Sequence, residues 1–590
     1  MRRPADAPPR LRTGHATLTF AAVGVLLAAA DTYVVVLALP DLMVGVGLDI
    51  DELQRAAPLV SIFLLGYVVV LPLAGRVSDV VGRMPVLFGS LLVFAAGSLV
   101  TASATGLPSA VTGRFLQGAG GGALVPVTLA LVADLWPPDR RGVPLGVVGA
   151  VQELGAVLGP LYGALVLAVA DWRAIFWVNL VAGLLLATGL WVARWRAHVP
   201  RSASGGSETT WQTGRHRDLL GGVLLVVAIV AGALALVRPA ALEESVRWGD
   251  LLVPAVADRA WSAPLALASV GAAAAFVGRE LTARNPMLDL RRAPAVLRAA
   301  DVPGAVLLGG ALGGVVLTFA GADPAVELVA PAGPWLLAGA AAALVAFAMR
   351  QRRASHPLVP AVAVRARPAW GALVVSLFTG AALIAVLVDV PVLVRTVVED
   401  VTQLDAALVL VRFLAALPIG ALIGGWLIRS LSPATVTTAG MVIATAGLAA
   451  ISRWGIGSLS GPGDDVVLAG AGFGFGLAVA PVNAAILTAT PRDTHGIASA
   501  LVVVARMVGM LAGLSALTAI GLRRLYSVQA GIESPAVTCP QAPTDCEPYE
   551  SAVRDAVVAQ LQVTFTGAAV CAAVAAVCAA VLLRDRRVVT

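Results

Sequence analysis

Lysine is absent from this sequence, and all 41 basic residues are arginine. A P-loop needs a lysine to hold nucleotide phosphates, so this absence excludes the commonest ATP-hydrolysing motif. The five histidines are scattered and form no metal-binding pattern, so we expect no metal site and no other cofactor. No stretch resembles the turn that presents a nucleophilic serine. The sequence therefore does not predict an enzyme.

Charge is also scarce: 13% of the 590 residues are charged, whereas 58% are hydrophobic and the mean hydropathy is +0.88. A soluble chain could not bury so much apolar surface, but a protein that spans the bilayer many times exposes it to lipid. The net charge of +6 does not indicate a nucleic-acid partner, because the arginines lie at the ends of apolar segments. The composition predicts an all-α integral membrane protein.

Sixteen apolar segments each have about the twenty residues that a membrane-spanning helix needs. We expect them at 17–40, 57–74, 84–103, 108–134, 143–169, 174–194, 218–237, 263–280, 302–320, 334–350, 369–391, 405–428, 434–453, 466–490, 497–521 and 560–583. Arginine-rich connections alternate with acidic or arginine-free ones, and the positive-inside rule therefore places both termini in the cytoplasm. A cleaved signal peptide is an alternative for the N-terminus, but the first apolar stretch continues past its candidate cleavage site.

Two outer connections carry further expectations. The longest, residues 523–557, contains Cys539 and Cys546 on the oxidising side of the membrane, so we predict a disulfide between them. The segment 391–405 has enough alternation to predict an external β-hairpin.

The stretch GRVSDVVGR follows the second expected span. Gly75 and Gly82 allow a tight cytoplasmic turn, and Asp79 and Arg83 place opposite charges beside the helix ends. A capped, solvated loop is the simpler interpretation. However, the spacing and the position resemble the loop signature of the major facilitator superfamily, which implies a role at the cytoplasmic gate.

Two later strings resemble the same superfamily. RFLQGAGGG places Arg114 in the fourth span, as in the superfamily's fourth-helix motif. ELGAVLGPLYG places three glycines on one face of the fifth span, with a proline that permits a kink. This helix-packing motif, which resembles that of the superfamily's antiporters, consists of Gly155, Gly159, Pro160 and Gly163. Close helix packing alone also explains glycines at this spacing.

Five longer strings resemble more narrowly the mycobacterial triacylglyceride exporters, within the fourteen-span drug–proton antiporter branch. They are DTYVVV, QELGAVLGPLYG, LVDV, ALPIGALIGGW and HGIASALVVVARMVGM. The resemblance implies two six-helix halves, location in the inner (plasma) membrane, and a periplasmic lipid-binding lipoprotein as partner. It divides the chain into an N-terminal half (1–200), a cytoplasmic linker with four inserted helices (201–360) and a C-terminal half (361–590). The relatives have two linker helices, so this chain has an additional pair.

We single out five ionisable residues within the expected spans: Asp31, Arg114, Glu153, Arg412 and Arg506. Structural ion pairs would explain them, but charges inside a membrane often mark ion pathways. We hypothesise that Asp31 and Glu153 take up protons and that Arg506 is their counter-charge in the other half.

These observations predict a proton-coupled secondary exporter of a lipid or another hydrophobic small molecule. Aromatic residues make up only 5% of the chain, which gives little support for stacking of planar drugs. A multidrug–proton antiporter is the alternative. A membrane scaffold or sensor without transport is a third possibility, although it would have no use for acidic residues within the spans.

Overall fold

The structure is a computed structural model that describes residues 9–584, except 48–52, 197–218, 238–248, 254–261, 284–290, 292, 321–331, 399–402, 460 and 540–545. In this part of the chain, sixteen helices have 19 residues or more and no strand occurs. Thirteen of them contain a stretch long and apolar enough to cross a membrane. The other three have shorter apolar stretches: α1 (Pro9–Gly45), α7 (Leu219–Val237) and α11 (Val302–Ala320). The predicted all-α membrane fold with about sixteen spans is confirmed.

The first six helices pack into an N-terminal bundle. After α1 they are α2 (Leu53–Val81), α3 (Arg83–Ala102), α4 (Leu107–Leu135), α5 (Gly142–Leu167) and α6 (Trp172–Arg196). The central helix is α4, which is buried over most of its length between α1, α2 and α3. Its run of glycines permits this position, because small residues let helix backbones approach closely within a membrane.

Six later helices pack into a C-terminal bundle. They are α14 (Arg367–Val397), α15 (Gln403–Leu427), α16 (Pro433–Ile451), α17 (Pro462–Ala489), α18 (His495–Gln529) and α20 (Glu547–Leu582). Proline in the first turn begins α14, α16 and α17, where its missing N–H costs no hydrogen bond. The bundles meet along two lines of contact, which we call the first seam (α2 with α18) and the second seam (α5 with α15).

The two bundles repeat one packing scheme. In each, the first helix packs against the fifth, the second and third pack against the fourth, and the third packs against the sixth. Glycines of the fourth helix mark equivalent positions, because a Cβ atom there would collide with a carbonyl of the second helix. Each glycine and the residue whose carbonyl it approaches are Gly118 with Phe63, Gly122 with Tyr67, Gly472 with Phe413, and Gly476 with Leu417.

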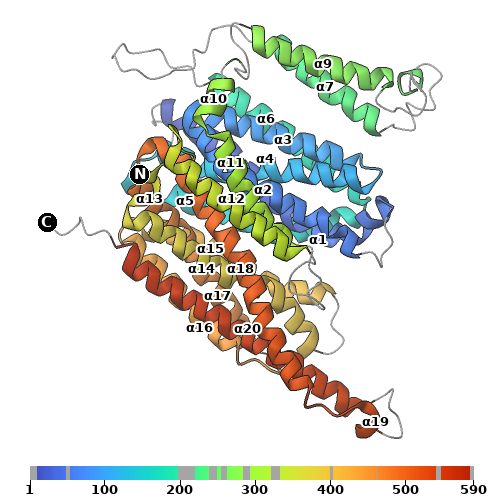
Figure 1. Ribbon diagram of the computed structural model, residues 1–590, viewed down its shortest axis with the longest axis vertical. Coiled ribbons are helices and arrows are strands. Elements are labelled where there is room, and N and C mark those ends of the chain that lie inside the picture. Colours follow the sequence, from blue (N-terminus) through green and yellow to red (C-terminus); the bar gives the residue numbers. More distant parts are fainter. Residues whose placement is uncertain are drawn as a thin grey trace, which may run out of the picture.

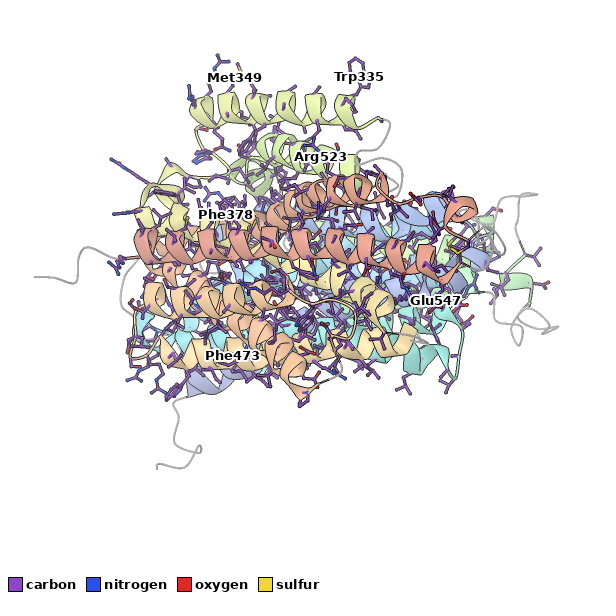
Figure 2. The ribbon with its side chains drawn as sticks, turned by 90° about the horizontal axis from the view of Figure 1, so that it is seen from below. Trp335, Met349, Phe378, Phe473, Arg523 and Glu547 are labelled. Carbon is purple, nitrogen blue, oxygen red and sulfur yellow. A yellow bond between two sulfur atoms is a disulfide. The ribbon has the colours of Figure 1, made fainter. Side chains whose placement is uncertain are left out.

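Four long helices between the bundles form two pairs. In the first pair, α7 packs against α9 (Pro264–Thr282), and Figure 1 shows both beside α3 and α6. In the second pair, α11 packs against α12 (Gly333–Arg353), against α2 and against α18. Trp335 and Met349 of α12 point outward at the edge of the molecule (Figure 2).

The second pair is fixed at two places, of which the first is a contact with α2. Gly309 and Gly313 of α11 pack against side chains of α2, and a Cβ atom at Gly309 would lie 2.6 Å from Val69 Cγ1. At the start of α11, Asp301 accepts hydrogen bonds from Arg350 Nε at 2.6 Å and from the backbone N–H of Leu358 at 3.3 Å.

The start of α1 and the end of α20 lie at one end of the molecule, and α19 (Pro535–Thr538) lies at the other (Figure 1). We call these the terminal end and the distal end. Near the distal end, α18 and α20 project beyond the other helices, since their 35 and 36 residues exceed the length that a bilayer requires.

Helices also occupy parts of the two connections that were expected to be irregular or β. Both ends of 523–557 are helical, and the acidic Glu547 and Glu550 in the first turn of α20 favour its early start. The predicted β-hairpin at 391–405 is wrong over its described residues, which continue α14 to Val397 and begin α15 at Gln403. Val394 is buried against the other helices of the bundle, so helix packing outweighs the β preference of this segment.

Candidate functional site

Asp31 lies in α1 within a closed network of side chains. Its Oδ2 accepts a hydrogen bond from Arg114 Nη1 at 2.6 Å. Its Oδ1 accepts hydrogen bonds from Asn179 Nδ2 at 2.5 Å and from Gln117 Nε2 at 3.3 Å. Asp31 is 1% exposed and Arg114 0%. Removing one member of a buried ion pair costs about 3–5 kcal/mol, so this network stabilises the core of the N-terminal bundle.

Arg114 extends the network to α2. Its Nε donates to the carbonyl of Leu59 at 3.3 Å, and its guanidinium lies 4.3 Å from the centre of the Phe63 ring. Arg114, and not Arg506, is therefore the counter-charge of Asp31 in this structure. The reason is that α4 packs directly against α1 and brings the arginine to the carboxylate.

Glu153 and Arg506 form a second ion pair, which joins the two bundles. Arg506 Nη1 of α18 donates to Glu153 Oε1 of α5 at 3.3 Å, and the side chains are 14% and 10% exposed. The structure therefore places Glu153 in contact with Arg506, whereas Asp31 is engaged within its own bundle.

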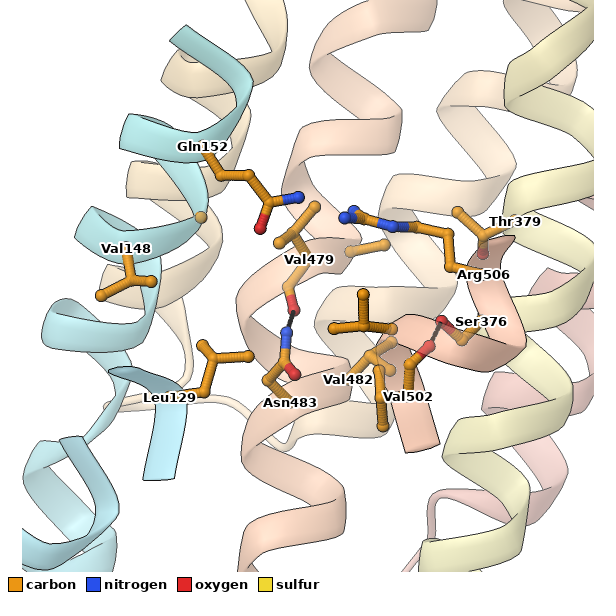
Figure 3. A pocket seen from close by; sticks show the side chains of 13 residues that line it. Leu129, Val148, Gln152, Ser376, Thr379, Val479, Val482, Asn483, Val502 and Arg506 are labelled. Carbon is orange, nitrogen blue, oxygen red and sulfur yellow. Dashed lines mark hydrogen bonds between the residues drawn. The ribbon is translucent and has the colours of Figure 1, made fainter. Parts of the chain in front are cut away.

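A cavity lies between the bundles beside Arg506, and helices α4, α5, α14, α17 and α18 line it. Most of its lining is aliphatic, and no aromatic side chain takes part. Its polar side chains are Gln152, Ser376, Thr379, Asn483 and Arg506, and Figure 3 shows Gln152 and Arg506 pointing toward one another across it.

At the terminal end, Asp79 of α2 caps the start of α18 across the first seam. Its Oδ1 accepts from the backbone N–H of Gly496 at 2.8 Å, and its Oδ2 accepts from that of Ile497 at 3.1 Å. The first amides of a helix have no partner within the helix and carry a partial positive charge, so a carboxylate is a strong cap. Arg83 Nη1 donates to the same carboxylate at 2.5 Å. We call Asp79 with the two amides the terminal latch.

Three further residues support the latch. Asp134 of α4 accepts from Arg83 Nε at 2.9 Å and so fixes the arginine. A Cβ atom at Gly75 would lie 2.5 Å from the carbonyl oxygen of Gly496, so only glycine permits this approach of α2 to α18. Gly82 has a φ of 92°, a left-handed conformation that favours glycine in the turn between α2 and α3.

The second seam is also closed at the terminal end, but by glycines alone. A Cβ atom at Gly142 of α5 would collide with the carbonyl of Gly425 of α15, and the converse holds as well. Gly146, one turn further along α5, also approaches Gly425. Both seams are therefore closed at the end that carries the chain termini.

The helix-packing motif lies within α5. A Cβ atom at Gly155 would lie 2.7 Å from the carbonyl oxygen of Leu26, so this glycine lets α5 approach α1 closely. Gly159 and Gly163 are buried in the same helix, and Pro160 lies between them.

Arg412 is not buried within the C-terminal bundle. It pairs with Asp465 in the first turn of α17, and the two side chains are 43% and 44% exposed. Arg412 lies within the apolar stretch Leu408–Leu427 of α15, as expected, and its half-exposed ion pair is of the structural kind that was the alternative interpretation. In the distal connection, the sulfurs of Cys539 and Cys546 are bonded at 2.02 Å.

Three features of the site were not foreseen from the sequence. Asp389 lies in α14 and makes no hydrogen bond or ion pair with the described residues. The signal was available, since Asp389 falls within the expected span 369–391. Gln117 and Asn179 complete the Asp31 network, and Asn483 lines the cavity. Uncharged amides give no comparable signal in an apolar sequence.

Comparisons with known proteins agree on one family. The sequence model of the Major Facilitator Superfamily matches residues 21–349. A triacylglyceride transporter of Mycolicibacterium hassiacum is 37% identical over 548 residues, covering 91% of this chain and 84% of the relative. A triacylglyceride transporter of Mycobacterium tuberculosis is 34% identical over 539 residues, covering 89% and 86%.

Solved structures share the fold at low sequence identity. The human organic anion transporter MFSD10 has a TM-score of 0.53 and 14% identity, over 97% of this chain and all of that one. The proton:xylose symporter XylE has a TM-score of 0.52 and 13% identity, over 96% and 95%.

Proposed function

Because the chain belongs to the major facilitator superfamily and is a membrane transporter, we propose that it exports a triacylglyceride-like lipid in exchange for protons. The terminal end faces the cytoplasm in this proposal, and the distal end faces outward from the inner membrane. The arginine distribution supports this orientation through the positive-inside rule. The names of the relatives support a lipid as the cargo.

The observation that carries the proposal is the Glu153–Arg506 pair. It joins the two bundles beside the cavity, so any change in its charge acts on the contact between them. A proton on Glu153 removes the attraction to Arg506 and favours an arrangement in which the bundles have rocked apart at the terminal end. Cargo then enters from the cytoplasmic side, and loss of the proton to the cytoplasm restores the pair.

Asp31 and Asp389 have supporting roles in this cycle. Asp31 is held by one cation and two amides within its own bundle, whereas the one ionic contact of Glu153 is 3.3 Å long and crosses between the bundles. We assign Asp31 to a second protonation step that releases Arg114. Asp389 makes no hydrogen bond or ion pair with the described residues, and we assign it as a further proton acceptor on the C-terminal side.

The terminal latch sets the resting arrangement. Both seams are closed at the terminal end, so the structure corresponds to a state in which the cavity is shut off from the cytoplasm. Release of Asp79 from the first turn of α18 is then required before cargo can enter.

The cavity favours a lipid over a planar drug. Aromatic residues bind planar cations through their ring faces, and none lines this cavity. The projecting ends of α18 and α20 offer a surface to a partner on the outer side, and we propose a periplasmic lipid-binding lipoprotein there.

Reconstitution into vesicles with an imposed pH gradient tests the function. We expect radiolabelled trioleoylglycerol to leave the vesicles when the outside is acidic, and the flux to disappear when an ionophore collapses the gradient. The Asp31→Asn variant tests the assigned second step, and it should slow the flux. Absence of gradient-dependent flux of any lipid, together with efflux of a cationic dye, would indicate a multidrug antiporter. Absence of both fluxes would contradict transport.

A further inference from the structure

Asn483 of α17 carries a hydrogen-bond acceptor without a partner. The residue lines the cavity and is 8% exposed. Its Nδ2 donates to the carbonyl of Val479 at 2.9 Å, as the dashed line in Figure 3 shows. This bond fixes the orientation of the amide, because only the NH₂ group can donate to a carbonyl. The buried Oδ1 is left with no hydrogen bond in the described structure.

The hydroxyl groups of the cavity are also acceptors toward a ligand. Ser376 donates its proton to the carbonyl of Val502 at 2.8 Å, and Thr379 donates to that of Val375 at 2.7 Å. A hydroxyl has one proton and two lone pairs, so only lone pairs remain for a ligand. The α14–α17 side of the cavity therefore offers acceptors that call for an O–H or N–H group.

The cavity also offers donors, one from α18 and one from α5. The guanidinium of Arg506 has five N–H groups, and its one ionic partner in the described residues is Glu153. The amide of Gln152 faces it in Figure 3. These donors suit ester carbonyl oxygens. The acceptors that line the cavity would repel a phosphate, and the charge of Arg506 is already balanced by Glu153, so the polar head that fits is neutral.

A triacylglyceride has six ester oxygens and no O–H or N–H group, so it can satisfy Arg506 and Gln152 but leaves Asn483 Oδ1 unpaired. A diacylglycerol replaces one ester by a hydroxyl, which supplies the missing donor. Starting from the proposed lipid export, we infer that the cavity prefers an acylglycerol with a free hydroxyl over a fully esterified one. One satisfied buried acceptor corresponds to about a tenfold preference in affinity.

Binding to the full chain in detergent tests this inference without depending on transport. Radiolabelled 1,2-dioleoylglycerol should bind about tenfold more tightly than trioleoylglycerol. A dioleoylglycerol whose hydroxyl is capped as a methyl ether should bind as weakly as trioleoylglycerol, although its shape is nearly unchanged. Equal affinity of the free and capped lipids would overturn the inference and would show that solvent satisfies Asn483.

Two variants locate the effect. Asn483→Leu removes the acceptor at similar volume, so it should weaken dioleoylglycerol binding to the trioleoylglycerol level and leave the latter unchanged. Thr437→Val, which removes another buried hydroxyl without a partner, on α16 and outside the cavity lining, should preserve the preference. A preference retained in Asn483→Leu would also overturn the inference.

Failure of the hydroxyl preference can be distinguished from failure of the proposed lipid export. Loss of binding of both lipids in Asn483→Leu would indicate a folding defect. In that case, the comparison of the free and capped lipids on the unaltered chain decides whether the hydroxyl preference exists. Gradient-driven export without a hydroxyl preference would contradict only this inference, whereas failure of all lipid export would contradict the proposed function.

Discussion

The two six-helix bundles share a packing scheme but fill equivalent positions with different chemistry. Arg114 lies one turn before the first contact glycine of α4, and Leu468 lies one turn before the equivalent glycine of α17. By the same alignment, Gln117 corresponds to Ala471. All four residues are 0% exposed. The N-terminal core is thus held by charges and hydrogen bonds, and the C-terminal core by apolar contacts.

The two seams differ in the same way. Each closes at the terminal end on a glycine of the second helix, Gly75 in one bundle and Gly425 in the other. One turn later, Asp79 of α2 caps α18, whereas the corresponding residue of the other bundle is the exposed Arg429, which lies just after α15. A guanidinium cannot accept a hydrogen bond from a helix amide, so only the first seam has a latch. The repeat supplies two similar bundles, and the charged residues that break the symmetry supply the means of switching.

The largest expected effect comes from replacing charged residues of the N-terminal core by apolar residues like those in the C-terminal core. Arg114→Leu leaves Asp31 buried without its counter-charge and is expected to lower the free energy of unfolding by about 3–5 kcal/mol. Adding Asp31→Leu should recover most of this loss, because the apolar residues of α17 show that such a core can pack. Thermal unfolding of the purified protein measures both variants.

A matched change in the other bundle controls this experiment. Leu468→Met should cost less than about 1.5 kcal/mol, because it nearly conserves volume. If Arg114→Leu unfolds at the wild-type temperature, the ion pair does not stabilise the core. A stable double variant that no longer exports lipid would show that the charges serve transport as well.

The second prediction concerns the ion pair between the bundles. Glu153→Gln keeps the shape of the side chain but cannot gain or lose a proton. The rate of gradient-driven export should fall about 100-fold, within the usual range of coupling between two sites. Flux assays in vesicles with and without a pH gradient measure this.

An exposed ion pair provides the comparison for this variant. Asp465→Asn removes the acid that pairs with Arg412 near a helix end and should change stability by less than about 1 kcal/mol, with export unchanged. If export by Glu153→Gln depends on the pH gradient as it does in the wild type, proton coupling must be assigned to Asp31 or Asp389 instead.

The third prediction tests whether the terminal latch makes the first seam different from the second. Asp79→Asn weakens the charge-assisted bonds to α18 by about 1.5–3 kcal/mol, so conformations open at the terminal end should become roughly 10- to 150-fold more populated. Arg429→Gln, at the equivalent position of the other bundle, should have no such effect because Arg429 caps no helix.

A buried cysteine reports on this opening. Ala500 lies against Gly75 within the first seam, so Ala500→Cys should react with a maleimide only when that seam opens. The background for this assay lacks Cys571 and Cys578, the two free cysteines. Equal labelling in the Asp79 and Arg429 variants would mean that the latch does not control the seam.

The smallest effect is expected from the distal disulfide. Replacing Cys539 and Cys546 by serine opens a loop with a sequence separation of 7, which corresponds to about 2–3 kcal/mol of local stability. Faster hydrogen exchange in residues 530–539 should detect this, with the unfolding temperature of the two bundles unchanged. A lower unfolding temperature would mean that the distal connection supports the whole C-terminal bundle.

Much of the fold follows from the sequence, because length and apolar composition determine where a membrane helix can form. The GRVSDVVGR stretch was identifiable from the spacing of its glycines and charges, but the contacts of Asp79 with α18 and of Arg83 with α4 were not, because helix packing brings these distant residues together. The partner of Asp31 was not, because Arg114 and Arg506 are both arginines within spans and only helix packing decides which one reaches the carboxylate. The ends of 523–557 were missed as helix because their polarity resembles that of a loop. Asp389 was overlooked although its charge within a span was visible.

The second linker pair, α11 and α12, affects how the molecule contacts the surrounding bilayer. Since α11 packs against both α2 and α18, annular lipids cannot reach the first seam along the length of α11. None of the described linker helices packs in this way against α5 or α15. Among the described helices, the first seam therefore has a linker helix packed against it and the second seam has none, so the two flanks of the dividing line between the bundles differ in what they present to the bilayer.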